Sequence, residues 1–173
     1  MENQQLINDL FKVLQSGDGS RMKDQLELNP QLANVENSDG LTPLGYAAHM
    51  GNQVIVQLLI DYDANVDAVS HSKISFIPSN TALHAAIAGQ RNLNVIRLLL
   101  AQHANPNIFD SVGHTSLHTA AFHDDNMELI RLLIEHGADV NAKQEGGLTA
   151  LSIAIEQGNH NVAELLRQNG AKE

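Results

Sequence analysis

Three histidines and two aspartates gather in one stretch of this 173-residue chain, namely His114, His118, His123, Asp124 and Asp125. Imidazole and carboxylate groups are ligands that zinc accepts, so the stretch could bind a metal ion. The spacing does not bring the three histidines to one face of a short helix. We therefore favour separate histidines, some buried and some at the surface, with no metal site. A ligand- or metal-responsive regulator using this His-rich segment stays as the alternative.

The rest of the sequence contains none of the catalytic or cofactor-binding motifs that we looked for. It has no cysteine, which excludes disulfides, thiolate metal sites and a cysteine nucleophile. It has neither a glycine-rich loop that would cradle phosphates nor the motif of a nucleophile elbow. We therefore expect no enzyme activity and no cofactor.

The net charge of the chain restricts the kinds of molecule that it can bind. Twenty acidic against ten Lys and Arg side chains give a net charge of −10. Such a surface repels phosphate backbones, so we expect no nucleic acid and no anionic membrane as partner. It would attract a partner with basic residues around its binding site, although an acidic surface can also have no role other than keeping the protein soluble.

The sequence contains no membrane span or signal peptide that we can identify. No run approaches the ~18 apolar residues of a membrane span, and residues 1–9 do not resemble a signal peptide, so we expect a cytoplasmic protein.

One motif organises the chain. Gly113-His-Thr-Ser-Leu-His-Thr-Ala-Ala121 recurs with edits, and its Thr falls at 42, 81, 115 and 149, in steps of 39, 34 and 34. A period in this range indicates stacked supersecondary units. We divide the single array into residues 1–36, 37–69, 70–109, 110–143 and 144–173. An insertion over 71–79 explains the longer step.

The sequence pattern of each unit predicts two short helices. The motif Thr is a suitable N-cap for the first helix, and Asn52, Asn92, Asn126 and Asn159 align as N-caps of the second. In the third unit we expect helices near 82–89 and 93–102. Units three and four carry one extra residue between their helices, around Gln90-Arg91 and Asp124-Asp125. In the first unit we expect Ser20 to cap a helix whose apolar residues are Met22, Leu26 and Leu28.

These motifs resemble the ankyrin repeat. Gly40–Ala48 and Gly113–Ala121 are similar to the family's Gly-x-Thr-Pro-Leu-His-x-Ala-Ala, and Gly137–Asn141 matches its Gly-Ala-Asp-Val-Asn. The resemblance implies an all-α repeat solenoid in which helix-turn-helix units are joined by extended, β-hairpin-like loops. Residues 1–36 and 144–173 would be the capping repeats of one ankyrin-repeat domain with about five repeats. The motif His is replaced by Gly45 and Ser152, and the motif Pro by Ala82, Ser116 and Ala150.

The resemblance also implies a protein-binding function, through a concave surface of loop tips and first helices. Because the motif residues form the scaffold, only the remaining positions can determine which partner binds. We expect the protein to be a monomer. On those positions and the insertion, the candidate partner-binding residues are His49, Met50, Ile74, Phe76, Ile77, Phe109, Val112, His114, Phe122, His123, Glu156 and Gln157. The alternatives are that Phe109 and Phe122 fold under neighbouring loops and that the insertion folds back over its neighbour. An accessory or inhibitor subunit of an enzyme would use the same surface.

Overall fold

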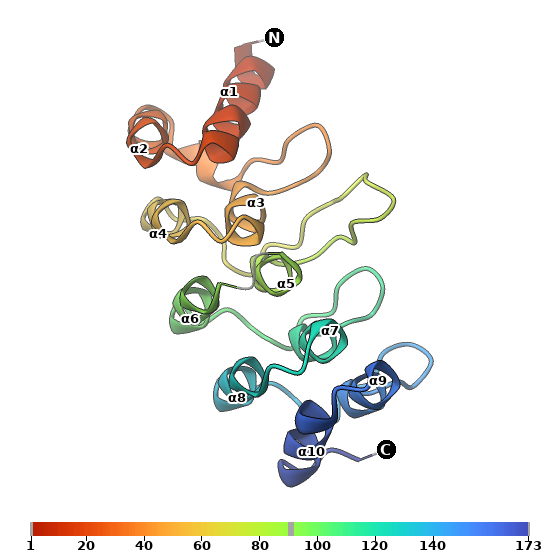
Figure 1. Ribbon diagram of the computed structural model, residues 1–173. Helices are drawn as coiled ribbons and strands as arrows, with labels where there is room; N and C mark the ends of the chain where they lie inside the picture. The colour runs from red at the N-terminus through yellow and green to blue at the C-terminus, as the bar shows by residue number, and fades with distance from the viewer. Residues whose placement is uncertain (1, 90–91, 173) are drawn as a thin grey trace. The chain divides into compact units, whose positions relative to one another are not determined.

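The computed structural model describes residues 2–89 and 92–172, and all regular structure in these residues is helical. The chain divides into two compact units, residues 1–103 and 104–173. Each unit is built from helix pairs in which a first helix is followed, after a short turn, by a second (Figure 1). The predicted all-α repeat architecture is therefore confirmed. In the described residues, no helix is long and apolar enough to cross a membrane.

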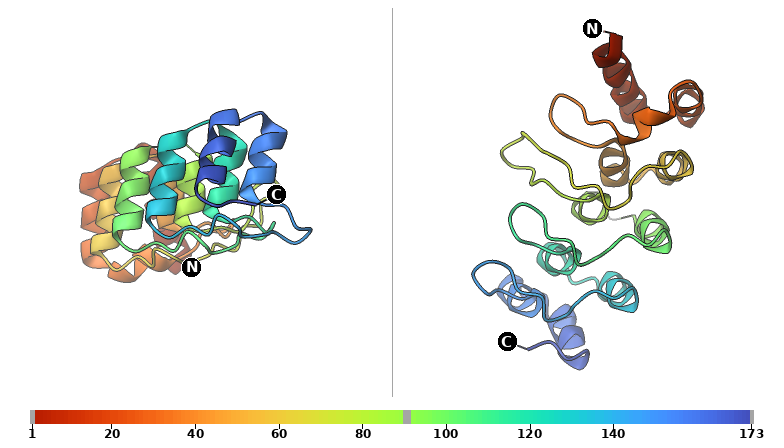
Figure 2. Two further views of the ribbon diagram at one scale, coloured as in Figure 1. Left: turned by 90° about the horizontal axis from the view of Figure 1, so that it is seen from below. Right: turned by 180° about the vertical axis from the view of Figure 1, so that it is seen from behind.

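The first unit contains three helix pairs. They are α1 (Glu2–Ser16) with α2 (Gly19–Leu28), α3 (Pro43–His49) with α4 (Gln53–Asp61), and α5 (Ala82–Ala88) with α6 (Leu93–Ala101). A 3-10 helix, η1 (Pro30–Asn34), follows α2. First helices pack on first helices, as α3 does on α5, and second helices on second helices, as α4 does on α2 and α6. The loops before α3 and α5 extend away from the helices on one side (Figure 2).

The second unit repeats this plan with two pairs. They are α7 (Ser116–His123) with α8 (Met127–Glu135), and α9 (Ala150–Gln157) with α10 (His160–Gln168). Helix α7 packs on α9 and α8, and α10 packs on α9 and α8. The loops of residues 110–114 and 144–148 precede the first helices of these pairs.

The buried positions are those that the repeated motif specifies. Leu44, Leu83, Leu117 and Leu151 are at most 2% exposed, and so are the small residues Ala47, Ala86, Ala120 and Ala154. Leucine supplies the apolar area that stabilises each helix pair. Alanine at the second set of positions is small enough for neighbouring helices to approach closely. The predicted scaffold role of both sets is confirmed.

Helix starts follow the predicted capping chemistry in most pairs. Thr42 accepts the backbone N–H of Gly45 through its hydroxyl, and Pro43 occupies the first helical position, where its missing N–H costs nothing. Asn52 caps α4 and Asn126 caps α8 by accepting the N–H three residues on. Helices α5 and α6 lie within the predicted ranges.

Four details differ from the sequence-based expectation or lie outside it. Asp18, not Ser20, is the N-cap of α2, since its carboxylate accepts the Arg21 N–H. Leu28, the last residue of α2, is 80% exposed, whereas Met22 and Leu26 are buried. Asn159 sits at the N-cap position of α10 but makes no capping bond with its side chain. The extra residue predicted around Gln90-Arg91 lies outside the described residues.

Candidate functional site

The loop before each of α3, α5, α7 and α9, which we call a finger, is closed by a backbone hydrogen bond at its base. In the second unit Asp110 N–H donates to the His114 carbonyl at 2.8 Å, and Gln144 N–H donates to the Leu148 carbonyl at 3.0 Å. The Asp110 carboxylate also accepts the N–H groups of Val112 and His114. The tip of this finger is therefore ordered by its own side chain, a role that sequence reading did not assign to Asp110. The signal was present, because Asp and Asn favour such turns.

The same finger carries two exposed apolar side chains. Phe109 is 46% exposed and Val112 is 59% exposed. The alternative that Phe109 folds beneath a neighbouring loop would bury its ring, which the exposure does not support. An ordered backbone thus holds apolar groups in water beside the half-buried His114.

The ring of His114 stacks on the ring of His118, with centroids 6.0 Å apart and planes at 14°. His118 is 1% exposed, and both of its ring nitrogens are engaged. Nδ1 accepts the Thr115 N–H at 3.2 Å and lies 2.8 Å from the Thr115 hydroxyl, and Nε2 lies 3.2 Å from the Leu148 carbonyl oxygen. Burial lowers the pKa of His118, and the Leu148 carbonyl opposes that shift. His118 is therefore a neutral scaffold group that links two repeats.

This arrangement does not support the metal alternative. His118 has no free nitrogen with which to bind an ion. Across residues 2–89 and 92–172, no three His or carboxylate side chains are positioned to hold a metal. Asp125, which the metal hypothesis would use as a ligand, serves another purpose in the neighbouring repeat.

Asp125 caps the start of α10 from the preceding repeat. Its Oδ1 accepts the Val162 N–H at 2.7 Å, and its Oδ2 accepts the Asn161 side-chain amide at 2.7 Å. The hydrogen bond from Val162 is the main reason why the pKa of Asp125 lies below its usual value. Asn159 donates to the Ala121 carbonyl instead, at 2.9 Å. The extra residue predicted around Asp124-Asp125 thus has a structural use.

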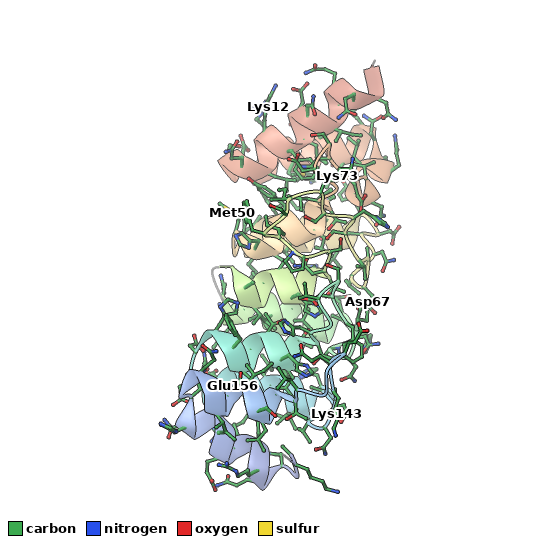
Figure 3. All side chains as sticks on the ribbon, turned by 90° about the vertical axis from the view of Figure 1, so that its right-hand side faces the viewer. Lys12, Met50, Asp67, Lys73, Lys143 and Glu156 are labelled. Carbon is green, nitrogen blue, oxygen red and sulfur yellow. The ribbon has the colours of Figure 1, made fainter. Side chains whose placement is uncertain are left out.

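The C-terminal ends of the two first helices carry the remaining candidates of the second unit. Phe122 is 50% exposed and His123 is also exposed, and their rings meet edge to face with centroids 5.5 Å apart. Glu156 and Gln157 hold the equivalent exposed positions on α9. In Figure 3, Glu156 lies on the side of the helices, away from Lys143, which directly precedes the finger of residues 144–148. Because α7 packs on α9, these two helix ends belong to adjacent repeats.

In the first unit, His49 and Met50 lie at the C-terminal end of α3, and both are exposed. Met50 is 44% exposed and is labelled at the end of that helix in Figure 3. Gly89, at the end of α5, lies against the His49 carbonyl so closely that a Cβ would overlap it. The two helix ends therefore adjoin, as those of α7 and α9 do.

The insertion places its three candidates at a finger tip. Ser70 and Asn80 close the base, since the Ser70 N–H donates to the Asn80 carbonyl at 2.9 Å and the Asn80 N–H donates to the Ser70 hydroxyl at 3.1 Å. Phe76 is 83% exposed, whereas Ile74 and Ile77 are half-buried. The alternative that these apolar residues fold back over the neighbouring unit does not fit Phe76, whose side chain is in water, whereas Ile74 and Ile77 are partly covered.

A family model described as "Ankyrin repeats (3 copies)" matches residues 8–110 and 83–173, which together cover nearly the whole chain. The chain is similar to "Ankyrin repeat, SAM and basic leucine zipper domain-containing protein 1" from Ornithorhynchus anatinus, with 36% identity over 100 residues, 57% of this chain and 20% of the relative. It is also similar to "Ankyrin repeat and SAM domain-containing protein 6" from Mus musculus, with 33% identity over 97 residues, 56% of this chain and 10% of the relative. The chain spans a fifth or less of the length of these two relatives.

Proposed function

Because the chain belongs to the ankyrin repeat family, whose repeats are generally protein–protein interaction modules, we propose that it binds a partner protein through exposed residues that the repeat motif does not specify. In the second unit these are the finger residues Phe109 and Val112, with the half-buried His114 beside them, and the helix-end residues Phe122, His123, Glu156 and Gln157. In the first unit His49 and Met50 hold the corresponding helix end.

One contrast carries the proposal. On and before α7, the motif residues Leu117, His118 and Ala120 are each 1% exposed, whereas Phe122 is 50% and Val112 59% exposed. The apolar side chains that the scaffold does not use are therefore in water. Aromatic residues in such positions are typical anchors of protein interfaces.

The ordered finger supports tight binding. Asp110 holds the backbone of residues 110–114 through two hydrogen bonds to its carboxylate, so little conformational freedom remains to be lost when a partner binds. The net charge of −10 favours a partner with basic residues around its apolar contact. The proposal further assigns the chain to the cytoplasm, as a monomeric, non-catalytic module, since ankyrin repeats are typically non-enzymatic.

The test compares two exposed apolar residues of the same unit. Phe122→Ser removes an anchor from the end of α7, and Met127→Ser is the matched control, since Met127 is 37% exposed at the start of a second helix. Tagged wild type and both variants are used to capture proteins from a native lysate, followed by quantitative mass spectrometry. We expect a protein retained by wild type and Met127→Ser to fall at least about tenfold with Phe122→Ser.

The melting temperatures of the three proteins decide how the result is interpreted. Equal values with selective loss of capture support an interface at Phe122. Equal capture by all three proteins contradicts the proposal, and a large drop in melting temperature for Phe122→Ser would make Phe122 a structural residue instead.

A further inference from the structure

The insertion finger, residues 70–80, differs from the other fingers in length and in charge. Nine residues separate the closing pair Ser70 and Asn80, against three between Asp110 and His114. From Ile74 to Asn80 the sequence is Ile-Ser-Phe-Ile-Pro-Ser-Asn, without a charged side chain, in a chain of which 17% is charged. In Figures 1 and 2 this loop runs beside the loop that precedes α3.

The stem of the insertion finger is fixed to that neighbouring finger, residues 36–41. The backbone N–H of His71 donates to the Gly40 carbonyl, and that of Lys73 to the Asp39 carbonyl, each at 2.9 Å. The His71 ring lies 2.8 Å from the Glu36 carboxylate, and the Lys73 ammonium donates to the Ser38 carbonyl at 3.0 Å. A glycine is required at position 40, because a Cβ there would overlap the His71 carbonyl. The stem is therefore held to the neighbouring finger at residues 71 and 73.

The tip is ordered as well, yet it leaves its largest side chain in water. The Ile77 N–H donates to the Ile74 carbonyl at 3.0 Å, which closes a turn around Phe76. Ile74 and Ile77 are half-buried, whereas Phe76 at 83% is the most exposed large apolar residue in the described chain. Without a bound partner, holding this ring out of any core gains nothing for the fold.

We propose that the insertion finger is a second contact site, in which Phe76 enters an apolar pocket on a partner protein. The pocket would be uncharged inside, because residues 74–80 carry no charge, and its surroundings neutral or basic, because this chain carries −10. The braced stem presents the ring with little entropy to lose. The site extends the proposed function, since it lies outside the residues that the repeat plan supplies.

Two other occupants fit the charges less well. A second copy of this chain also carries −10, and an anionic lipid surface is negative too, so both repel the protein that bears the finger. Either would leave a distinct signature in the experiment below.

The test places the photo-crosslinking residue p-benzoyl-phenylalanine at position 76 of the full chain in its source cells. The same residue at position 54 is the control, since Val54 is 64% exposed on α4. We expect a discrete adduct with another protein from position 76 only. That protein, made recombinantly, should bind Phe76→Ser at least about tenfold more weakly than wild type in calorimetric titration, with Val54→Ser unchanged. The melting temperature of Phe76→Ser should equal that of wild type.

Several results would overturn the inference: no adduct beyond that at position 54, an adduct with a second copy or with lipid, or an adduct partner whose affinity ignores Phe76→Ser. Titrating Phe122→Ser against the same partner separates the two proposals. Weaker binding of Phe122→Ser together with normal binding of Phe76→Ser would remove this inference and leave the proposed function standing.

Discussion

Replacing His118 with Ser tests whether this histidine is a neutral scaffold group. The fifth repeat already carries the replacement, since Ser152 lies at the equivalent position, where its hydroxyl is 3.0 Å from that of Thr149. His118→Ser can therefore keep the local cap of α7. It loses the contact of Nε2 with the Leu148 carbonyl and the packing of a ring that is 1% exposed.

The expected cost follows from these two losses. A hydrogen bond contributes about 0.5–1.5 kcal/mol, and the space left by the ring adds roughly 1–2 kcal/mol at about 24 cal/mol per Å³ of cavity. We expect His118→Ser to lower the free energy of unfolding by about 2–3 kcal/mol. Urea unfolding followed by circular dichroism at pH 7.5 measures this difference.

The pH dependence gives a second readout. Burial lowers the pKa of His118 in the folded protein, so the unfolded chain binds a proton first as the pH falls below about 6.5. Stability is then highest above that pH and is lost below it, by up to about 1.4 kcal/mol between pH 7.5 and 5.5 for one such group. His118→Ser should reduce the pH-dependent loss, by no more than this upper limit.

A control on the same helix checks that the effect belongs to the buried ring. His123→Ser changes an exposed residue and should alter the unfolding midpoint little. The reasoning is refuted if His118→Ser costs less than about 0.5 kcal/mol, the lower bound for one hydrogen bond, or if it keeps the full pH-dependent loss of the wild type.

Three further substitutions follow from the geometry. Ser116→Ala should raise the free energy of unfolding by about 1 kcal/mol, because the Ser116 hydroxyl is buried with no hydrogen-bond partner in the described residues; a loss of stability in urea unfolding would refute this. Gly40→Ala should lower the melting temperature more than Gly147→Ala, because both have positive φ but only the first adds a clash, so equal shifts would contradict the docked stem. Asp125→Ala should lower the melting temperature at pH 7, because the variant loses the hydrogen bond from the Val162 N–H that also holds the pKa of the Asp125 carboxyl below its usual value. This difference between variant and wild type should shrink as the pH falls below about 4, since protonation of Asp125 ends its contribution to stability. A difference that persists at low pH would argue against the cap.

Much of the fold follows from sequence because it depends on local chemistry repeated at a fixed period. Thr42 with Pro43 starts α3 and Asn52 starts α4 as predicted, since a cap involves residues only three apart. The buried Leu and Ala positions follow from the same periodicity. The predicted membership of the ankyrin repeat family is likewise confirmed by the family match.

What sequence reading missed depends on contacts between distant residues. Asp125 caps a helix 36 residues further on, and nothing near it in the sequence indicates that target. The brace between the fingers joins Glu36 to His71, 35 residues apart, and alignment of repeats cannot show it because the insertion has no counterpart. Asp18 and Ser20, on either side of Gly19, are both suitable N-caps, and the sequence alone does not rank them.

The candidate site was only partly accessible from sequence for a related reason. Periodicity identifies the positions that the scaffold does not use, such as Val112 and Phe122, but not whether their side chains fold under a neighbour. Their exposure, 59% and 50%, answers that question. The partner is determined in part by its own surface, which this sequence does not encode.

Hydrogen–deuterium exchange with a captured partner tests the central claim most directly, namely that the motif residues stabilise the fold while positions outside the motif bind the partner. We predict that the partner slows amide exchange in residues 109–114 and at the C-terminal ends of α7 and α9. Exchange in the second helices α8 and α10 should not change. Protection confined to α8 and α10, with none at the finger or the first-helix ends, would contradict the account.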